Sequence, residues 1–139
     1  MALVLNEEQS MLKDAAAGFL AEKATVAHLR ELRDSGDATG FSQDVWKEMA
    51  DMGWAGIAID EEFGGLGYGY TGLGLVLEQV GRNLSASPLQ SSVLIGATII
   101  AELGDQAQKE QFLPAIASGQ SIVSLALQEG AHHAPSHIA

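Results

Sequence analysis

The sequence predicts an all-α chain, an up-and-down bundle of about six helices followed by one strand. Three observations predict this fold class. Apolar residues recur at helical spacing along most of the chain. Polar capping residues precede these segments, and glycines follow several of them. The last apolar run, SIVSLAL at residues 121–127, has instead the length and the branched side chains of a buried strand.

Three helices are predicted in the first part of the chain, and each has a capping signal at one end. Asn6, followed three residues later by Gln9, is typical of a capping box at the start of the first helix. Gly36 is placed to end the second helix, and Ser42 is a good N-cap for the third. The expected helices cover about residues 6–20, 25–34 and 42–52.

Residues 54–59, WAGIAI, resemble a short apolar strand, and three more helices follow them. Ser87 with Pro88 is typical of an N-cap followed by a proline at the first helical position. The helix that starts there is apolar nearly all round, so we expect it to be central in the bundle. Pro114 should kink or end the last helix. These helices cover about residues 71–82, 88–103 and 105–119.

The single predicted strand decides the expected domain organisation. One strand cannot satisfy its own backbone donors and acceptors, so it needs partner strands that the sequence does not contain. We therefore expect residues 1–120 to form an N-terminal helical domain and residues 121–139 to open a β-domain. On this interpretation the chain is the N-terminal piece of something larger.

The charge balance excludes some classes of partner. The formal net charge is −11, and only two of the seven basic residues, Arg82 and Lys109, follow Lys47. Nucleic-acid binding depends on many contacts from Lys and Arg to phosphate, so we expect no nucleic-acid partner. The most apolar stretch, residues 89–103, contains too many polar residues for a spanning helix, so we expect no membrane insertion.

Cysteine usage and the N-terminus favour a cytoplasmic location. The chain contains no cysteine, which excludes a disulfide framework and thiolate chemistry. Its first residues, MALVLNEEQ, lack the basic region of a signal peptide.

The segment at 60–70, DEEFGGLGYGY, predicts a shaped loop. Four glycines fall within six positions, and each glycine in a helix or strand interior costs about 0.5–1 kcal/mol relative to alanine. Such a loop lets a ligand or another part of the backbone come close. The alternative, which we weigh equally, is a connector that touches no ligand.

Three segments of the chain occur in an order that matches a known family. Leu5, Glu8, Gln9 and Leu12 are similar to an L-x-x-E-Q-x-x-L opening helix. The glycine loop resembles the signature P-E-x-x-G-G-x-G. The last segment, GDQAQKEQFLPAIASGQ at 104–120, is similar to G-x-x-x-Q-K-x-x-x-L-P-x-x-A-x-G. Together they resemble the N-terminal helical domain of the acyl-CoA dehydrogenase family, and the resemblance spans nearly the whole chain.

The resemblance implies a flavin-dependent desaturation of an acyl-CoA thioester. In the family a carboxylate removes the α-proton, and the β-hydrogen leaves as hydride to the flavin of FAD. Electrons then pass to an electron-transfer flavoprotein, and the enzymes are dimers or tetramers, so a homo- or hetero-oligomer is expected. The proton-abstracting Glu of the family lies in a later helical domain. We therefore name no catalytic residue in this chain and expect the chain alone to be inactive.

The resemblance also implies which residues contact substrate and cofactor. The family places its acyl tail against the fifth helix, where the expected substrate-binding residues are Ser91, Ser92 and Ile95. Tight helix packing at the small residues Ser91, Ser92 and Gly96 is the alternative. The strand at 121–127 should face the flavin, and its expected cofactor-binding residues are Leu125, Leu127 and Gln128.

The residues after this strand depart from the family pattern. Family members commonly read T-E-P-G-x-G-S-D, whereas this chain reads QEGAHHA from Gln128, with only Glu129 retained in place. The loss of the serine indicates a divergent branch, or a subunit whose own site has decayed. A non-catalytic helical subunit or scaffold of the same fold is therefore kept as the alternative function.

Three further patterns are weaker candidates for function. The histidines His132, His133 and His137 have ligand spacing, but Pro135 breaks the helix they would need, so a polar loop is the simpler interpretation. The glycines at 67, 69 and 72 match a dinucleotide motif without the strands that it requires. The carboxylates of Glu78 and Glu102 are expected to be solvated or paired rather than to act as general bases.

Overall fold

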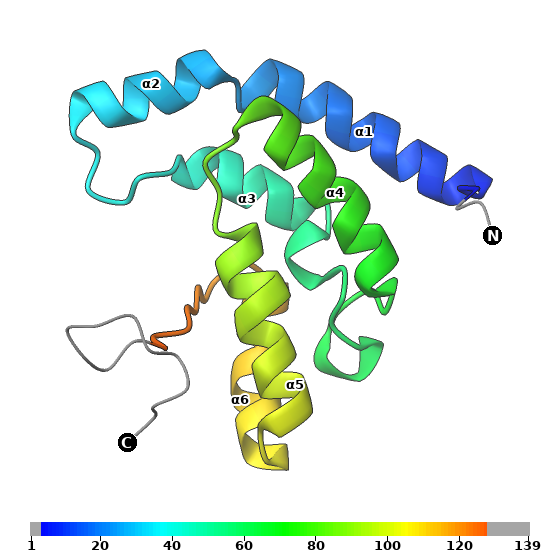
Figure 1. Ribbon diagram of the computed structural model, residues 1–139. Coiled ribbons are helices and arrows are strands. Elements are labelled where there is room, and N and C mark those ends of the chain that lie inside the picture. Colours follow the sequence, from blue (N-terminus) through cyan, green and yellow to red (C-terminus); the bar gives the residue numbers. More distant parts are fainter. Residues whose placement is uncertain (1–3, 128–139) are drawn as a thin grey trace.

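A computed structural model describes residues 4–127 and confirms the predicted helical fold (Figure 1). Within these residues there are six α-helices, one π-helical segment and two short 3-10 helices, and no strand. In chain order the elements are α1 (Glu7–Lys23), α2 (Val26–Ser35), α3 (Gln43–Asp51), η1 (Trp54–Gly56), η2 (Glu61–Phe63), α4 (Gly69–Asn83), η3 (Leu89–Ala97), α5 (Thr98–Leu103) and α6 (Gln106–Ala117). None of the described helices is long and apolar enough to cross a membrane.

Several of the predicted caps are confirmed. Asn6 accepts a hydrogen bond from the amide of Gln9 at 2.8 Å, and the Gln9 side chain accepts one from the Asn6 amide at 3.1 Å. An equivalent capping box joins Asp105 and Gln108 at the start of α6. Gly36 ends α2 in the left-handed conformation that favours glycine, with φ of 67°. These polar residues satisfy the backbone groups that a helix end leaves unpaired.

The predicted strand at 54–59 is wrong. This run forms the 3-10 helix η1 and a following turn, and its residues 54–57 are all buried rather than alternately exposed. The carbonyls of Gly56, Ile57 and Ile59 accept hydrogen bonds from the amides of residues 66, 68 and 67 of the glycine loop. The run therefore folds against the loop that follows it, and this explains why an apolar run of strand length forms no strand.

Two helix boundaries expected beside prolines are also wrong. Ser87 does not cap the fifth helix, since η3 begins at Leu89 and the Ser87 hydroxyl, buried in the structure, has no hydrogen-bond partner there. Pro114 lies inside α6, which continues to Ala117. Proline removes the hydrogen bond to the carbonyl of Glu110, but both residues lie on the exposed face, where water can replace that bond.

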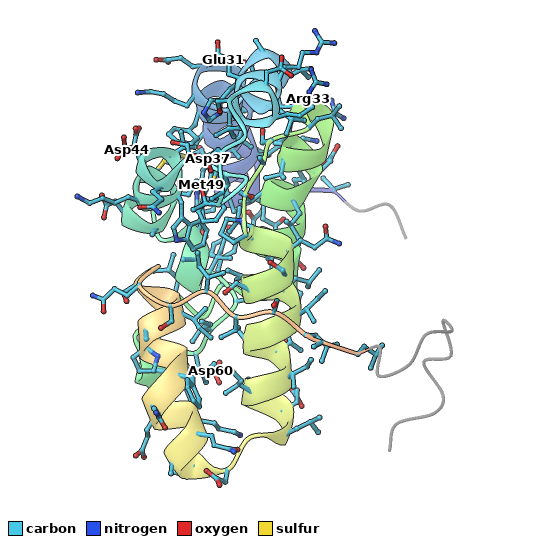
Figure 2. All side chains as sticks on the ribbon, turned by 90° about the vertical axis from the view of Figure 1, so that its left-hand side faces the viewer. Glu31, Arg33, Asp37, Asp44, Met49 and Asp60 are labelled. Atoms are coloured by element: carbon cyan, nitrogen blue, oxygen red, sulfur yellow. The ribbon has the colours of Figure 1, made fainter. Side chains whose placement is uncertain are left out.

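The interior is divided between two hydrophobic cores. We call the larger one the first core; it lies among α1, α3, η1, α4 and the start of η3. Its largest members are Leu20, Trp46, Met49, Trp54, Ile57, Leu73, Val76, Leu89 and Val93. The second core lies between the glycine loop, η3 and α6, and it consists of Ile59, Phe63, Ala97, Leu113, Ile116 and Ala117. Met49 marks the level of the first core and Asp60 that of the second (Figure 2).

The helix formed by η3 and α5 joins these two cores. It carries Leu89 and Val93 into the first core and Ala97 into the second. α1 and α4 pack along one another beside the first core, and α5 and α6 pack together at the other end (Figure 1). The expectation that the apolar fifth helix is central is confirmed for η3, whereas α5 has no buried residue.

Residues 121–127 do not form the predicted strand in the structure. A strand is defined by hydrogen bonds to a neighbouring strand, and no such neighbour exists within residues 4–127. The segment instead leaves the end of α6 and crosses the η3–α5 helix (Figure 2). We call residues 118–127 the exit segment.

Candidate functional site

The candidate site is the face of η3 over which the exit segment passes. Ser92 is fully buried there, with 0% of its surface exposed, and its hydroxyl oxygen accepts a hydrogen bond of 3.2 Å from the amide of Val123. Gly96 lies one turn further along the same face, because residues four apart on a helix are neighbours. A Cβ atom at Gly96 would lie 2.2 Å from Cγ2 of Val123. The exit segment is therefore in direct contact with the helix backbone.

The exit segment is also fixed where it leaves α6. The indole Nε1–H of Trp46 donates a hydrogen bond of 2.9 Å to the carbonyl of Gly119, and the amide of Ser121 donates one of 2.9 Å to Ala115. Gly119 has φ of 73°, and a Cβ there would lie 2.5 Å from Cβ of Ala50. Both the conformation and the close approach require glycine at this point. The segment thus has fixed contacts from Gly119 to Val123.

The predicted substrate-binding residues do not share one environment. Ser91 and Ile95 are half-buried, and the Ser91 hydroxyl donates a hydrogen bond to the carbonyl of Pro88 at 3.2 Å. Ser92 points under Val123 instead. The structure therefore brings Ser92 to the exit segment and leaves Ser91 and Ile95 partly open to solvent. Their contact with an acyl chain stays a prediction.

The residues expected to bind the flavin fit that group in their chemistry. Leu125 and Leu127 are 49% and 44% exposed. Within the part of the chain that the structure describes, the amides of residues 124–127 make no hydrogen bond. Exposed apolar side chains of this kind match a flat apolar ring, as the flavin ring is. Gln128 lies outside the described residues, as do the three histidines at 132, 133 and 137.

The glycine loop packs mainly against its own chain. A Cβ at Gly65 would lie 2.0 Å from the carbonyl oxygen of Ile59, a distance that no other residue type tolerates. A cavity of about 200 Å³ lies between the loop and the η3–α5 helix, with Phe63, Tyr70 and Thr98 among its lining residues. The close approach that the sequence predicted is thus confirmed for another part of the backbone, which favours the connector interpretation of this loop.

The two carboxylates considered as general bases are engaged elsewhere. Glu78 accepts a hydrogen bond of 2.8 Å from Arg82 and lies 3.5 Å from the ammonium group of Lys13. The hydrogen bond from Arg82, followed by the charge of Lys13, lowers the pKa of Glu78, whereas a general base near neutral pH needs a raised one. Glu102 is exposed. The expectation that both are paired or solvated is confirmed.

Among residues 4–127 no group of three His, Cys, Asp or Glu side chains is arranged to hold a metal ion.

The contacts of Trp46 with Gly119 and of Ser92 with Val123 were not predicted from the sequence. Trp46 lies on the apolar stripe of α3, which predicts burial but not its distant partner. No local signal at Val123 indicates its contact, because that contact depends on how the exit segment turns back.

Comparison with known proteins identifies similar chains. Residues 6–120 match the model of the family described as "Acyl-CoA dehydrogenase, N-terminal domain". The chain is 32% identical over 127 residues to mitochondrial isovaleryl-CoA dehydrogenase of Bos taurus, covering 90% of this chain and 29% of that protein. It is also 32% identical over 133 residues to acyl-CoA dehydrogenase FadE12 of Mycobacterium tuberculosis, covering 95% and 33%.

A solved structure shares the fold. The ChsE4–ChsE5 complex from Mycobacterium tuberculosis contains a chain that superposes with a TM-score of 0.83 at 25% identity, covering 96% of this chain and 36% of the other. The chain thus spans about a third of the length of the relatives it matches.

Proposed function

Because the chain belongs to the acyl-CoA dehydrogenase family, we propose that it is the N-terminal helical domain of a flavin-dependent acyl-CoA dehydrogenase. The match of residues 6–120 to the family's N-terminal domain carries this proposal. The proposed reaction is the α,β-desaturation of an acyl-CoA thioester. We propose residues 1–120 as the helical domain and residues 121–139 as the start of a β-domain. The proton-abstracting base is assigned to the remainder of the protein.

We propose that the acyl chain lies along η3, with Ser91, Ser92 and Ile95 forming part of its wall. The half-buried state of Ser91 and Ile95 supports this, because each side chain is set in the fold while part of its surface is available to a ligand. An acyl tail needs no charged partner, because burial of its apolar surface is enough to favour binding. The small side chain of Ser91 leaves room for the tail.

FAD is the proposed cofactor, and Leu125, Leu127 and Gln128 are the proposed residues beside it. The flavin, when bound, supplies the hydride acceptor for the desaturation. The contribution of this chain is to present the exit segment at a fixed position and to exclude water on the side of η3. The exposure of Leu125 and Leu127 supports the assignment, since both side chains have surface left to cover.

The proposed partners are the acyl-CoA substrate, an electron-transfer flavoprotein and further copies or related subunits in a dimer or tetramer. The CoA phosphates are proposed to bind outside this domain, because Arg82 is already paired with Glu78 and few other cations are present. Replacing Arg82 and Lys109 together by alanine should leave the KM for acyl-CoA within a few-fold. A rise of tenfold or more, about 1.4 kcal/mol of binding, would overturn this point.

Turnover assays test the proposed function. We call this domain joined to the remaining domains of its dehydrogenase the complete protein. The complete protein should contain bound flavin and should reduce a dye acceptor with an acyl-CoA, whereas the 139-residue chain with added FAD should not. A complete protein without flavin or turnover would favour the non-catalytic scaffold, which the altered residues from Gln128 to Ala134 support.

The acyl wall has its own test. Ser91→Leu adds volume at a half-buried position and should shift the preference of the complete protein to shorter acyl chains. Ile95→Ala removes volume and should shift it to longer ones. A preference that moves with neither variant would contradict the placement of the acyl chain along η3.

A further inference from the structure

We propose that Ser92 is a positioning residue for the flavin site, and that it acts by holding the exit segment at Val123. The inference rests on the proposed function, and it gives Ser92 a role distinct from lining the acyl chain. Ser92 and Gly96 on η3 hold Val123 on the exit segment, and we call these three residues the clamp.

The hydrogen bond is the first part of the clamp. Ser92 is fully buried, and the amide of Val123 is part-buried where it donates to the Ser92 hydroxyl oxygen. Removing the oxygen leaves that amide without its partner, which is more costly than the net value of the bond itself. Ser91, the neighbouring serine, uses its hydroxyl within its own helix instead, since it donates to the carbonyl of Pro88.

The missing side chain of Gly96 is the second part. A Cβ atom there would lie 2.2 Å from Val123 Cγ2 and 3.3 Å from Val123 Cβ, well inside van der Waals contact. Val123 therefore sits on the helix backbone itself, with no side chain between them. The bond at Ser92 and the contact at Gly96 fix the same residue from two points on one helical face.

Val123 is the last fixed point of the exit segment before the proposed flavin residues. The earlier contacts are those of Trp46 with Gly119 and of Ser121 with Ala115. After Val123 no hydrogen bond holds the amides of residues 124–127 within the described part of the chain. Leu125 follows only two residues later, about 7 Å along an extended chain. Because functional groups must be held to within about 0.5 Å, a shift at Val123 changes the site directly.

The test uses the complete protein and four variants. Ser92→Ala removes the acceptor and nothing else, and Ser91→Ala is its matched control. Gly96→Ala pushes against Val123, and the double variant Gly96→Ala with Val123→Ala removes the methyl groups that it meets. Three quantities are measured: hydrogen exchange of the peptide containing Val123, the dissociation constant of FAD, and the visible circular dichroism of the bound flavin.

Ser92→Ala should speed exchange at Val123 and weaken FAD binding by about fivefold, the equivalent of one hydrogen bond of about 1 kcal/mol. The flavin dichroism should change as well, whereas Ser91→Ala should leave all three measurements as in the parent protein. Gly96→Ala should weaken FAD binding further, and the double variant should recover much of the loss. A domain that was merely destabilised would show no such recovery by a second truncation.

Other outcomes overturn the proposal. If Ser92→Ala leaves the Val123 exchange and the flavin dichroism unchanged, Ser92 does not position the exit segment. If Ser92→Ala changes only the preference for acyl chain length, Ser92 is a wall residue alone. If the parent complete protein contains no flavin, the proposed function has failed instead, and the exchange at Val123 still shows whether the clamp exists.

Discussion

The two hydrophobic cores of this domain differ in how completely they are closed. The first core is surrounded by α1, α3 and α4, and its central residues, such as Leu20, Met49 and Leu73, are fully buried. The second core is smaller and leaves apolar surface uncovered beside it, where Leu103 is 82% and Phe112 is 39% exposed. A single helix, η3 with α5, connects them.

The difference indicates that the first core mainly stabilises the domain, whereas the second core leaves a surface open for contacts. A closed core of long helices supplies most of the apolar burial, and thus most of the stability. The open side of the second core forms a groove lined by Ile99, Ile100, Leu103, Gly104, Gln108, Phe112 and Val123. Val123 of the exit segment lines this groove, so the exit segment passes next to the less complete core.

Truncating one leucine in each core compares them most directly. Leu73→Ala in the first core should reduce the free energy of unfolding by about 3–5 kcal/mol, because the surrounding long helices cannot collapse around the cavity. Leu113→Ala in the second core should cost about 2–3 kcal/mol, because fewer packed neighbours remain to lose contacts. Urea denaturation of each variant measures both values. Equal losses would mean that the two cores are equally rigid.

The glycine loop between the cores provides the next comparison. Phe63 of the loop belongs to the second core and Tyr68 packs against the first, so the loop contacts both cores. Gly65→Ala should cost about 3 kcal/mol, since its Cβ meets the Ile59 carbonyl and the backbone has to move. Gly64→Ala is the control: it has φ of 80° with open space around it, and should cost about 1–2 kcal/mol from conformation alone.

Chemical denaturation decides between these causes. If Gly64→Ala destabilises the domain as much as Gly65→Ala, the loop tolerates the close approach, and its glycines matter only for their backbone conformation.

The sequence predicted the parts of this fold that depend on local chemistry. Capping boxes and αL glycines are short-range features, so Asn6, Gly36 and Asp105 could be placed correctly without any tertiary information. The run at 54–59 could not, because its apolar residues are buried by a turn that depends on the glycine loop. The sequence shows Ser92 only as a small residue on an apolar helix, because its hydrogen-bond partner lies 31 residues away. Long-range pairing of that kind leaves no periodic signal in one sequence.

The two capping boxes begin one helix at each core and should contribute equally. Asn6→Ala at α1 and Asp105→Ala at α6 should each cost about 1 kcal/mol, since each removes the acceptor for a backbone amide at the helix start. Hydrogen exchange should rise at Gln9 in the first variant and at Gln108 in the second. Exchange that spreads along all of α6 but stays confined to the first turn of α1 would identify the second core as the weaker support.

The smallest effect is expected from the ion pair that joins α1 to α4 beside the first core. Glu78 accepts a hydrogen bond from Arg82 and faces Lys13, and both lower its pKa in the folded state. The carboxylate therefore stabilises the fold above its unfolded pKa of about 4.3, and this contribution is lost as the pH falls through the lower folded value. Glu78→Gln should reduce the urea midpoint slightly at pH 7 and by less at pH 3, with Glu62→Gln, an exposed residue of η2, as the control. Because the pair is solvent-exposed, added salt should also reduce the difference in urea midpoint between Glu78→Gln and the parent protein at pH 7. A midpoint difference of the same size at pH 7 and pH 3 would show that the charge of Glu78 does not stabilise the contact between α1 and α4.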